Sequence, residues 1–136
     1  MTQEDKDLLL KDLCARLPYG VKMNHIADEE ICPLTLVGVA KDMITLQGGG
    51  GYACTCVEDY TPYLFPLSSM TDEQKKKYNW LKHSVFVCHY EYGDVVEEIE
   101  LYDSPESFEY LIENHFDYRG LIEKGLAIDA TGLNIY

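Results

Sequence analysis

The chain has 136 residues, of which 46% are hydrophobic and 26% charged, and it carries a formal net charge of −13 at pH 7. This length predicts a single domain over residues 1–136 with its own core, and the composition excludes disordered and fibrous proteins. Because so acidic a chain repels phosphate backbones, we expect no direct binding to nucleic acid.

The sequence also lacks the marks of export and membrane insertion. No apolar run approaches the roughly 20 residues that span a bilayer, and residues 1–7 are acidic where a secretory signal is basic. We therefore expect a cytoplasmic protein with no membrane association. The cysteines are odd in number and scattered, which favours reduced, mostly buried thiols over a disulfide framework. They are Cys14, Cys32, Cys54, Cys56 and Cys88.

Leucines at helical spacing predict a first helix over residues 3–17, which Thr2 can cap and Pro18 ends. From residue 21 to residue 57 the pattern changes to short strand-like segments separated by turns. Their close spacing predicts a small curled antiparallel sheet in an α+β fold. An SH3-like barrel is the first choice and an open meander the second.

The glycine run at 48–51 precedes a strand-like segment, not a Lys-Ser/Thr pair and a helix. We therefore interpret it as a hairpin loop, since a phosphate-binding loop needs helix amides facing the anion. Residues 60–67 combine two prolines with large apolar side chains, which predicts an extended, packed segment.

Thr71 and Gln74 have capping-box spacing, so a second helix is expected over residues 72–82. Residues 84–102 then predict a β-hairpin with Gly93-Asp94 as its two-residue turn. That register places one set of residues on a shared face, which we expect to lie in the core. The set is Phe86, Cys88, Tyr90, Tyr92, Val95, Glu97, Ile99 and Leu101.

Carboxylates dominate the stretch from Glu91 to Glu113, which contains nine acidic residues and no Lys or Arg. Because the hairpin and the next helix both contribute, we predict a candidate acidic interaction face. Its members are Glu91, Glu98, Glu100, Glu106 and Glu109.

A third helix is predicted over residues 105–116, with Pro105 at its first position, and a frayed tail from residue 129. The helix ends in a polar cluster of His115, Asp117, Tyr118 and Arg119. In an enzyme, His115 would act as a general base that Asp117 orients, and Arg119 would bind an anion.

The interpretation that we favour for this polar cluster is structural. His115 would complete the apolar face of the helix, and Asp117 and Arg119 would satisfy backbone groups near the first helix. The histidines and cysteines lack metal-ligand spacing, and no nucleophile motif is present. We therefore assign no catalytic residue, metal site or cofactor.

Three blocks carry a family resemblance: LLLKDLCARLPYGVK at 8–22, PYLFPLSSMT at 62–71 and HFDYRGLIEKGLA at 115–127. Together they resemble a family of small uncharacterised proteins from gut Bacteroidetes and their phages and prophages. The resemblance implies that the chain is an accessory protein of a phage or mobile element, and it implies no mechanism.

Three functions remain open. The first is a non-enzymatic interaction module that binds a protein through its sheet and the aromatic side chains of Tyr52, Tyr60 and Tyr63. The second is an acidic mimic of nucleic acid that inhibits a host defence or regulatory protein. The third is an enzyme that uses the 115–119 cluster. The sequence favours the first.

Overall fold

The computed structural model describes residues 1–136, and the chain forms two compact units. The larger unit consists of residues 1–69 and 112–136, and the smaller one of residues 70–111. Length and composition had indicated one domain and gave no sign of this division.

The larger unit begins with helix α1 (Gln3–Arg16), which agrees with the predicted helix over 3–17. The Thr2 hydroxyl accepts a hydrogen bond from the Asp5 amide at 3.1 Å and so caps the first turn. After α1 the chain makes a 3-10 turn (η1, Leu17–Tyr19), and Gly20 ends it in the left-handed conformation with φ of 68°.

A mixed sheet of seven strands forms the rest of this unit, in the order β4-β3-β2-β1-β5-β8, with β9 also paired to β5. The pairs among β1 to β5 are antiparallel, whereas β8 and β9 run parallel to β5. The strands are β1 (Lys22–His25), β2 (Leu34–Ala40), β3 (Met43–Gly48), β4 (Gly51–Cys56), β5 (Tyr60–Pro66), β8 (Phe116–Asp117) and β9 (Ile128–Asp129).

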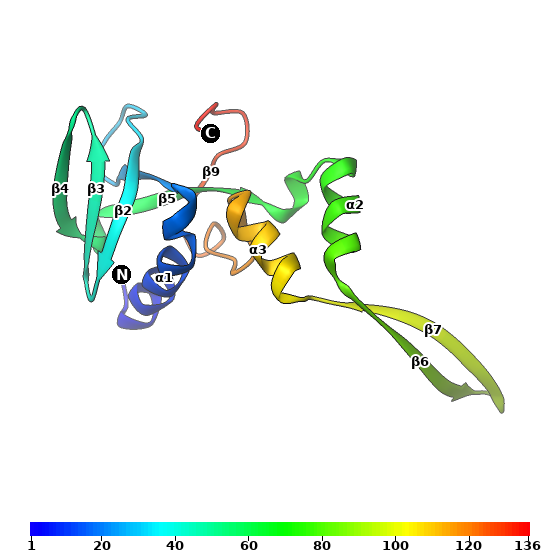
Figure 1. Cartoon of the computed structure of the whole chain (residues 1–136). Coiled ribbons are helices and arrows are strands. Elements are labelled where there is room, and N and C mark those ends of the chain that lie inside the picture. Colours follow the sequence, from blue (N-terminus) through cyan, green and yellow to red (C-terminus); the bar gives the residue numbers. More distant parts are fainter. The chain divides into compact units, whose positions relative to one another are not determined.

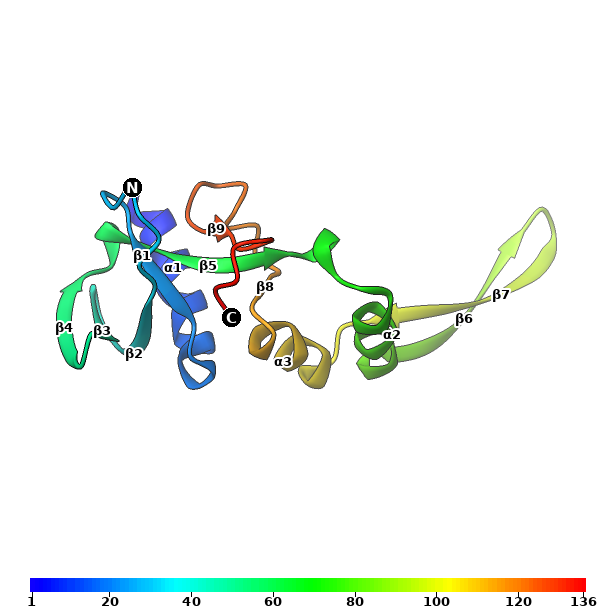
Figure 2. The same cartoon turned by 90° about the horizontal axis from the view of Figure 1, so that it is seen from above.

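The α+β class is therefore confirmed, and the sheet does not close into a barrel. Strands β1 to β4 form a meander, labelled in Figure 2, and β5 returns to pair with β1. The predicted extended segment over 60–67 corresponds to β5. Two 3-10 turns flank it, η2 (Val57–Asp59) and η3 (Leu67–Ser69).

The core of the larger unit lies between α1 and the sheet. Leu9 and Leu13, one turn apart on α1, are fully buried, as the leucine spacing predicts. They pack with strand residues and with residues of the C-terminal segment. The buried cluster consists of Leu9, Leu13, Val21, Met23, Leu36, Ile44, Leu46, Val57, Leu64, Leu121, Leu126 and Ala127.

The C-terminal segment is ordered against the sheet, so the prediction of a frayed tail from residue 129 is wrong. Ala130 is buried, and its amide donates to the Leu64 carbonyl at 2.8 Å. The Tyr136 hydroxyl accepts from the Lys22 amide at 2.9 Å and donates to the Tyr63 carbonyl at 2.7 Å. This hydroxyl bridges β1 and β5 one residue beyond their last paired position, and Figure 2 shows the C-terminal segment beside β5.

The smaller unit contains helix α2 (Asp72–Leu81), strands β6 (His83–Glu91) and β7 (Asp94–Tyr102), and most of helix α3 (Pro105–Glu113). The predicted capping box is present, since Thr71 and Gln74 each bond the other's backbone amide. Helix α3 ends three residues before the predicted residue 116. The reason is that His115 adopts the left-handed conformation, with φ of 63°.

The hairpin exists, but its turn lies one residue earlier than predicted. Tyr92 and Gly93 have φ of 53° and 84°, and Glu91 pairs with Asp94. A tight two-residue turn of this kind needs positive φ at both central positions, which places Gly93 second rather than first. The pairing therefore shifts by two residues, and because side chains alternate with a period of two, each residue within the strands keeps its predicted face.

All five cysteines are free and exposed, so the prediction that most are buried is wrong. None of the helices is both long and apolar enough to span a bilayer.

Candidate functional site

A buried ionic network lies behind the predicted polar cluster and joins it to α1. Asp12 and Arg16, one turn apart on α1, are both fully buried, and the Arg16 Nε lies 2.7 Å from the Asp12 Oδ2. The other carboxylate oxygen accepts from the Arg119 Nε at 3.1 Å. One buried carboxylate is thus shared by two guanidinium groups, an arrangement that compensates charge inside the protein.

Arg16 also holds the backbone of the cluster. Its Nη2 donates to the Phe116 carbonyl at 2.6 Å. The guanidinium carbons of Arg16 and Arg119 lie 5.6 Å and 4.8 Å from the centre of the Tyr118 ring, within the range of cation–π attraction. Arg16 and Arg119 therefore fasten the segment after α3 to α1. The spacing of Asp12 and Arg16 on a leucine-rich helix was a signal of this network that the sequence reasoning did not use.

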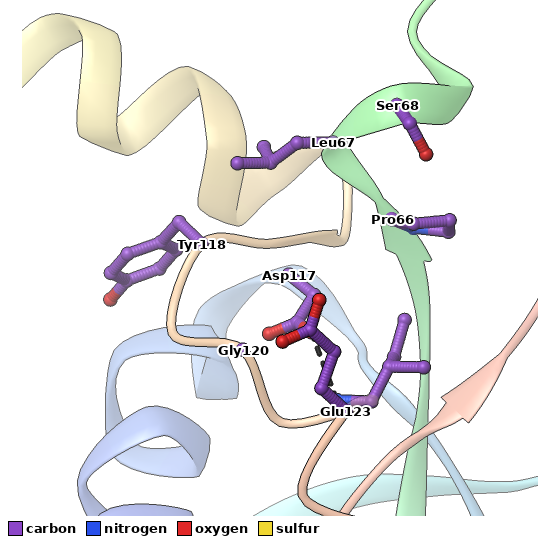
Figure 3. A pocket seen from close by; sticks show the side chains of 8 residues that line it. Pro66, Leu67, Ser68, Asp117, Tyr118, Gly120 and Glu123 are labelled. Carbon is purple, nitrogen blue, oxygen red and sulfur yellow. Dashed lines mark hydrogen bonds between the residues drawn. The ribbon is translucent and has the colours of Figure 1, made fainter.

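Asp117 stabilises the loop that follows it. Its Oδ1 accepts from the Leu121 amide and its Oδ2 from the Ile122 amide, both at 2.9 Å. Because both carboxylate oxygens are occupied by backbone donors, the side chain acts as a cap for the turn that begins at Gly120. Figure 3 shows Asp117 inside this loop. Neither of these two bonds involves His115, so they do not give Asp117 the predicted role of orienting the imidazole.

The structural interpretation placed His115 on the apolar face of the third helix, and this is wrong, because α3 ends at Glu113. Its ring stacks on Tyr136, with ring centres 3.7 Å apart and planes at 12°. Burial lowers the pKa of His115 from 6.5 to about 4, and the positive charge of Arg16 adds to this effect. The ring is neutral at pH 7, and a base with so low a pKa is poorly matched to catalysis near neutrality.

This depressed pKa predicts a pH-dependent stability. The unfolded chain protonates His115 near pH 6.5 and the folded chain only near pH 4, so stability is lost as pH falls from about 6.5 to about 4. The slope is at most about 1.4 kcal/mol per pH unit, and solvent screening at this partly exposed site reduces the pKa shift and with it the total loss of stability. Urea unfolding of wild type and His115→Asn at pH 7 and pH 5 measures it. Asn tolerates the left-handed backbone, and equal pH dependence in the two proteins would contradict the prediction.

A pocket with a volume of about 330 Å³ adjoins the polar cluster (Figure 3). Its acidic side chains are Asp117, which caps the loop, and the exposed Glu123. No group of three or more side chains of the metal-binding types comes together anywhere in the chain. The pocket is lined by Pro66, Leu67, Ser68, Asp117, Tyr118, Gly120, Ile122 and Glu123.

The tyrosines assigned to a binding face of the sheet do not form one. Tyr63 is buried, Tyr60 is half-buried with its ring edge-on to His25, and only Tyr52 is exposed. Tyr52 lines a second, smaller pocket of about 220 Å³ beside the glycine loop. Tyr52 is the one residue lining this pocket that has an ionisable side chain.

The largest collection of exposed apolar side chains lies on the β6–β7 hairpin. Eight of the nineteen large hydrophobic residues that are exposed belong to residues 83–102, so they are concentrated and not scattered. The face predicted to lie in the core is open to solvent, and that prediction is wrong. Tyr92, which the structure places in the turn, is 99% exposed. The large apolar members that lie in the strands are between 46% and 82% exposed, namely Phe86, Tyr90, Val95, Ile99 and Leu101.

The physical reason for this exposure is that the two-stranded ribbon is not packed against a second layer. Strands β6 and β7 pair only with each other, and no other strand extends their sheet. On the second face of the ribbon, Val85 and Tyr102 are also exposed. We call the face of Phe86, Tyr90, Val95, Ile99 and Leu101 the apolar hairpin face.

The predicted acidic face is divided between two elements. Glu91, Glu98 and Glu100 share the face opposite the apolar hairpin face, while Glu106 and Glu109 lie on α3. Glu97 is on the apolar hairpin face itself, opposite Cys88. The hairpin from residue 83 to residue 102 carries five carboxylates and no Lys or Arg.

The base of the hairpin is anchored within the smaller unit. The Ser104 hydroxyl, next to the end of β7, donates to the Leu81 carbonyl at the end of α2 at 2.6 Å. The Tyr78 hydroxyl of α2 donates to the Asp103 carboxylate, and burial raises the Tyr78 pKa. These bonds fix the two ends of the ribbon, which extends away from α2 in Figures 1 and 2. The hairpin is therefore an anchored arm with both faces exposed.

No protein-family model matches this chain, and no solved structure matches it.

Proposed function

We propose that this protein is a non-enzymatic interaction module and that the β6–β7 hairpin is its protein-binding arm. The observation that carries the proposal is the exposure of the apolar hairpin face on a ribbon that is anchored at its base. Contiguous exposed apolar surface with a polar border is typical of protein–protein contact sites. Aromatic side chains, which are enriched at such sites, are represented by Phe86 and Tyr90.

Stability gives a second argument for a partner. A two-stranded hairpin alone is marginally stable in water, because it buries little apolar surface. Burial of Phe86, Ile99 and Leu101 against a partner would supply the missing contacts. The larger unit has its own core and does not depend on this burial.

The acidic-mimic hypothesis has less support. It required the apolar side chains to turn inward so that carboxylates alone formed the outer wall. The exposed Phe86 and Ile99 do not meet that requirement. A setting in a phage or mobile element rests on the family resemblance and stays a prediction.

The enzyme hypothesis is disfavoured because residues of the 115–119 cluster make structural contacts within the fold. Asp117 caps a loop, Arg119 binds the buried Asp12, and His115 stacks on Tyr136. These contacts favour a structural role for the cluster, but through other partners than predicted: Asp117 bonds amides of its own loop, and Arg119 bonds a side chain of α1 and not its backbone.

The experiment is a capture assay with the immobilised full chain in a lysate of gut Bacteroidetes cells. Phe86 and Ile99 face each other across the ribbon, so Phe86→Ser/Ile99→Ser removes the centre of the apolar hairpin face. We expect capture of partners identified by mass spectrometry to fall at least about tenfold, as for central apolar contacts elsewhere.

A matched control is Tyr52→Ser/Trp80→Ser, which removes two exposed aromatic side chains outside the hairpin. This variant should keep wild-type capture. Circular dichroism and thermal melting check that both variants fold. If the hairpin variant folds and captures the same proteins as wild type, the proposal is wrong.

A further inference from the structure

The outer edge of β7 has no strand paired with it. Strand β7 pairs with β6 over nine consecutive positions without a bulge and with no other strand. Bulges, prolines and charged side chains are the usual devices that keep a strand edge from pairing with another chain. Residues 94–102 contain no proline and no lysine. The backbone of this edge is therefore free to pair, and the acidic side chains of β7 decide which kind of strand it accepts.

The charge on this edge is of one sign. Four of the nine residues of β7 are acidic (Asp94, Glu97, Glu98 and Glu100), whereas β6 has one, Glu91. A strand added beside β7 places its side chains next to these carboxylates at cross-strand distance, where opposite charges stabilise the pair and like charges destabilise it.

The same charges argue against a second copy as the occupant. Pairing β7 with another β7 would bring four carboxylates from each edge together without a cation. One of these four, Glu97, lies on the otherwise apolar hairpin face, and an inward-pointing charge of this kind is a known barrier to the pairing of two like edges. The net charge of −13 on each chain acts in the same direction.

We propose that the arm binds a basic, extended segment of a partner protein, which adds as a third strand along β7. The inference rests on the proposed function. Strand addition of this kind gains affinity from main-chain hydrogen bonds and specificity from alternate side chains. In the bound segment, aliphatic residues lie beside Ile99 and Leu101, and Lys or Arg residues lie beside Glu98 and Glu100 on the opposite face.

The test uses the full chain and synthetic nine-residue peptides. The probe alternates Lys and Val, starting and ending with Lys. One control alternates Ser and Val, and another has the composition of the probe with lysines and valines in pairs, which destroys the two-residue period. We expect the alternating basic peptide to bind at least about tenfold more tightly than either control by calorimetry.

Amide hydrogen exchange locates the bound strand. The turn at Tyr92-Gly93 makes Glu91 and Asp94 a hydrogen-bonded pair, after which bonded and non-bonded pairs alternate. The amides of Val95, Glu97, Ile99 and Leu101 are therefore expected to point away from β6. The basic peptide should slow their exchange, and exchange that is unchanged at all four overturns strand addition at β7.

Charge reversal supplies the matched pair of variants. Glu98→Lys/Glu100→Lys should weaken binding of the basic peptide at least about tenfold and should strengthen binding of a peptide that alternates Glu and Val. Glu29→Lys/Glu30→Lys makes the same change of net charge in an exposed loop of the larger unit. It should leave both affinities within about twofold, because salt screens distant charges.

The outcomes separate this inference from the proposed function. Equal binding of the Lys-Val and Ser-Val peptides overturns the basic partner and leaves the arm as the proposed binding site. If the chain dimerises with rising concentration and Phe86→Ser/Ile99→Ser abolishes this, the occupant is a second copy. That result also overturns the basic partner. If no peptide binds and this variant captures partners as wild type does, both proposals fail.

Discussion

Asp12→Ala is expected to lower the free energy of unfolding by about 3–5 kcal/mol. The substitution leaves the guanidinium group of Arg16 fully buried without its carboxylate, and breaking a buried ion pair on one side typically has this cost. Arg119 loses its contact as well, although its side chain is 21% exposed and can reach water. Urea unfolding followed by circular dichroism measures the effect.

A control and a compensating variant make this test specific. Asp7→Ala removes an exposed carboxylate of the same helix that accepts from the Gln3 side chain, and should change stability by no more than about 0.5 kcal/mol. Asp12→Leu/Arg16→Met removes both charges and should be less destabilising than Asp12→Ala. If Asp12→Ala is as stable as wild type, the account of a stabilising buried network is wrong.

Asp117→Ala should be the second most damaging change, with an expected loss of about 2–4 kcal/mol. Two hydrogen bonds from the amides of Leu121 and Ile122 to one carboxylate would be lost, and bonds to charged groups are worth more than neutral ones. The amide of Leu121 lies in the core and cannot turn to solvent. Thermal and urea unfolding of the variant provide the measurement.

Glu123→Ala is the matched control, because Glu123 is an exposed carboxylate that lines the same pocket. Its loss should change stability by no more than about 0.5 kcal/mol. If Asp117→Ala is as stable as Glu123→Ala, the carboxylate is not a structural cap, and a functional role for Asp117 becomes the better explanation.

Local signals in the sequence predicted several elements well. Thr2, Thr71 and Pro18 mark helix ends through local bonding and backbone geometry, and the corresponding helices α1 and α2 agree with expectation. The meander of β1 to β4 follows from short strand-like segments, which needed no information from distant residues.

Features that depend on distant contacts could not be predicted. The parallel strands β8 and β9 are two residues long and exist only because β5 lies beside them. Tyr136 is ordered by Lys22 and Tyr63, more than 70 residues away, so its position left no local pattern.

The polar cluster and the hairpin show the same limit at the candidate sites. The polar character of residues 115–119 is visible in the sequence, but Asp12, the partner of Arg119, lies about a hundred positions earlier. Alternation correctly assigned Phe86 and Ile99 to one face of the hairpin. Alternation shows that two faces differ, and it cannot show which of them another element covers.

The central claim is that the apolar hairpin face is open to solvent in the free protein. Nuclear magnetic resonance with a soluble paramagnetic agent tests it directly, because the agent broadens signals of side chains that it can approach. We predict strong broadening of the methyl signals of Val95, Ile99 and Leu101, and little at the buried Ile44 and Leu64. Methyl groups of Ile99 and Leu101 that are as protected as those of Ile44 would show that the face is covered within the chain, and would contradict the binding arm.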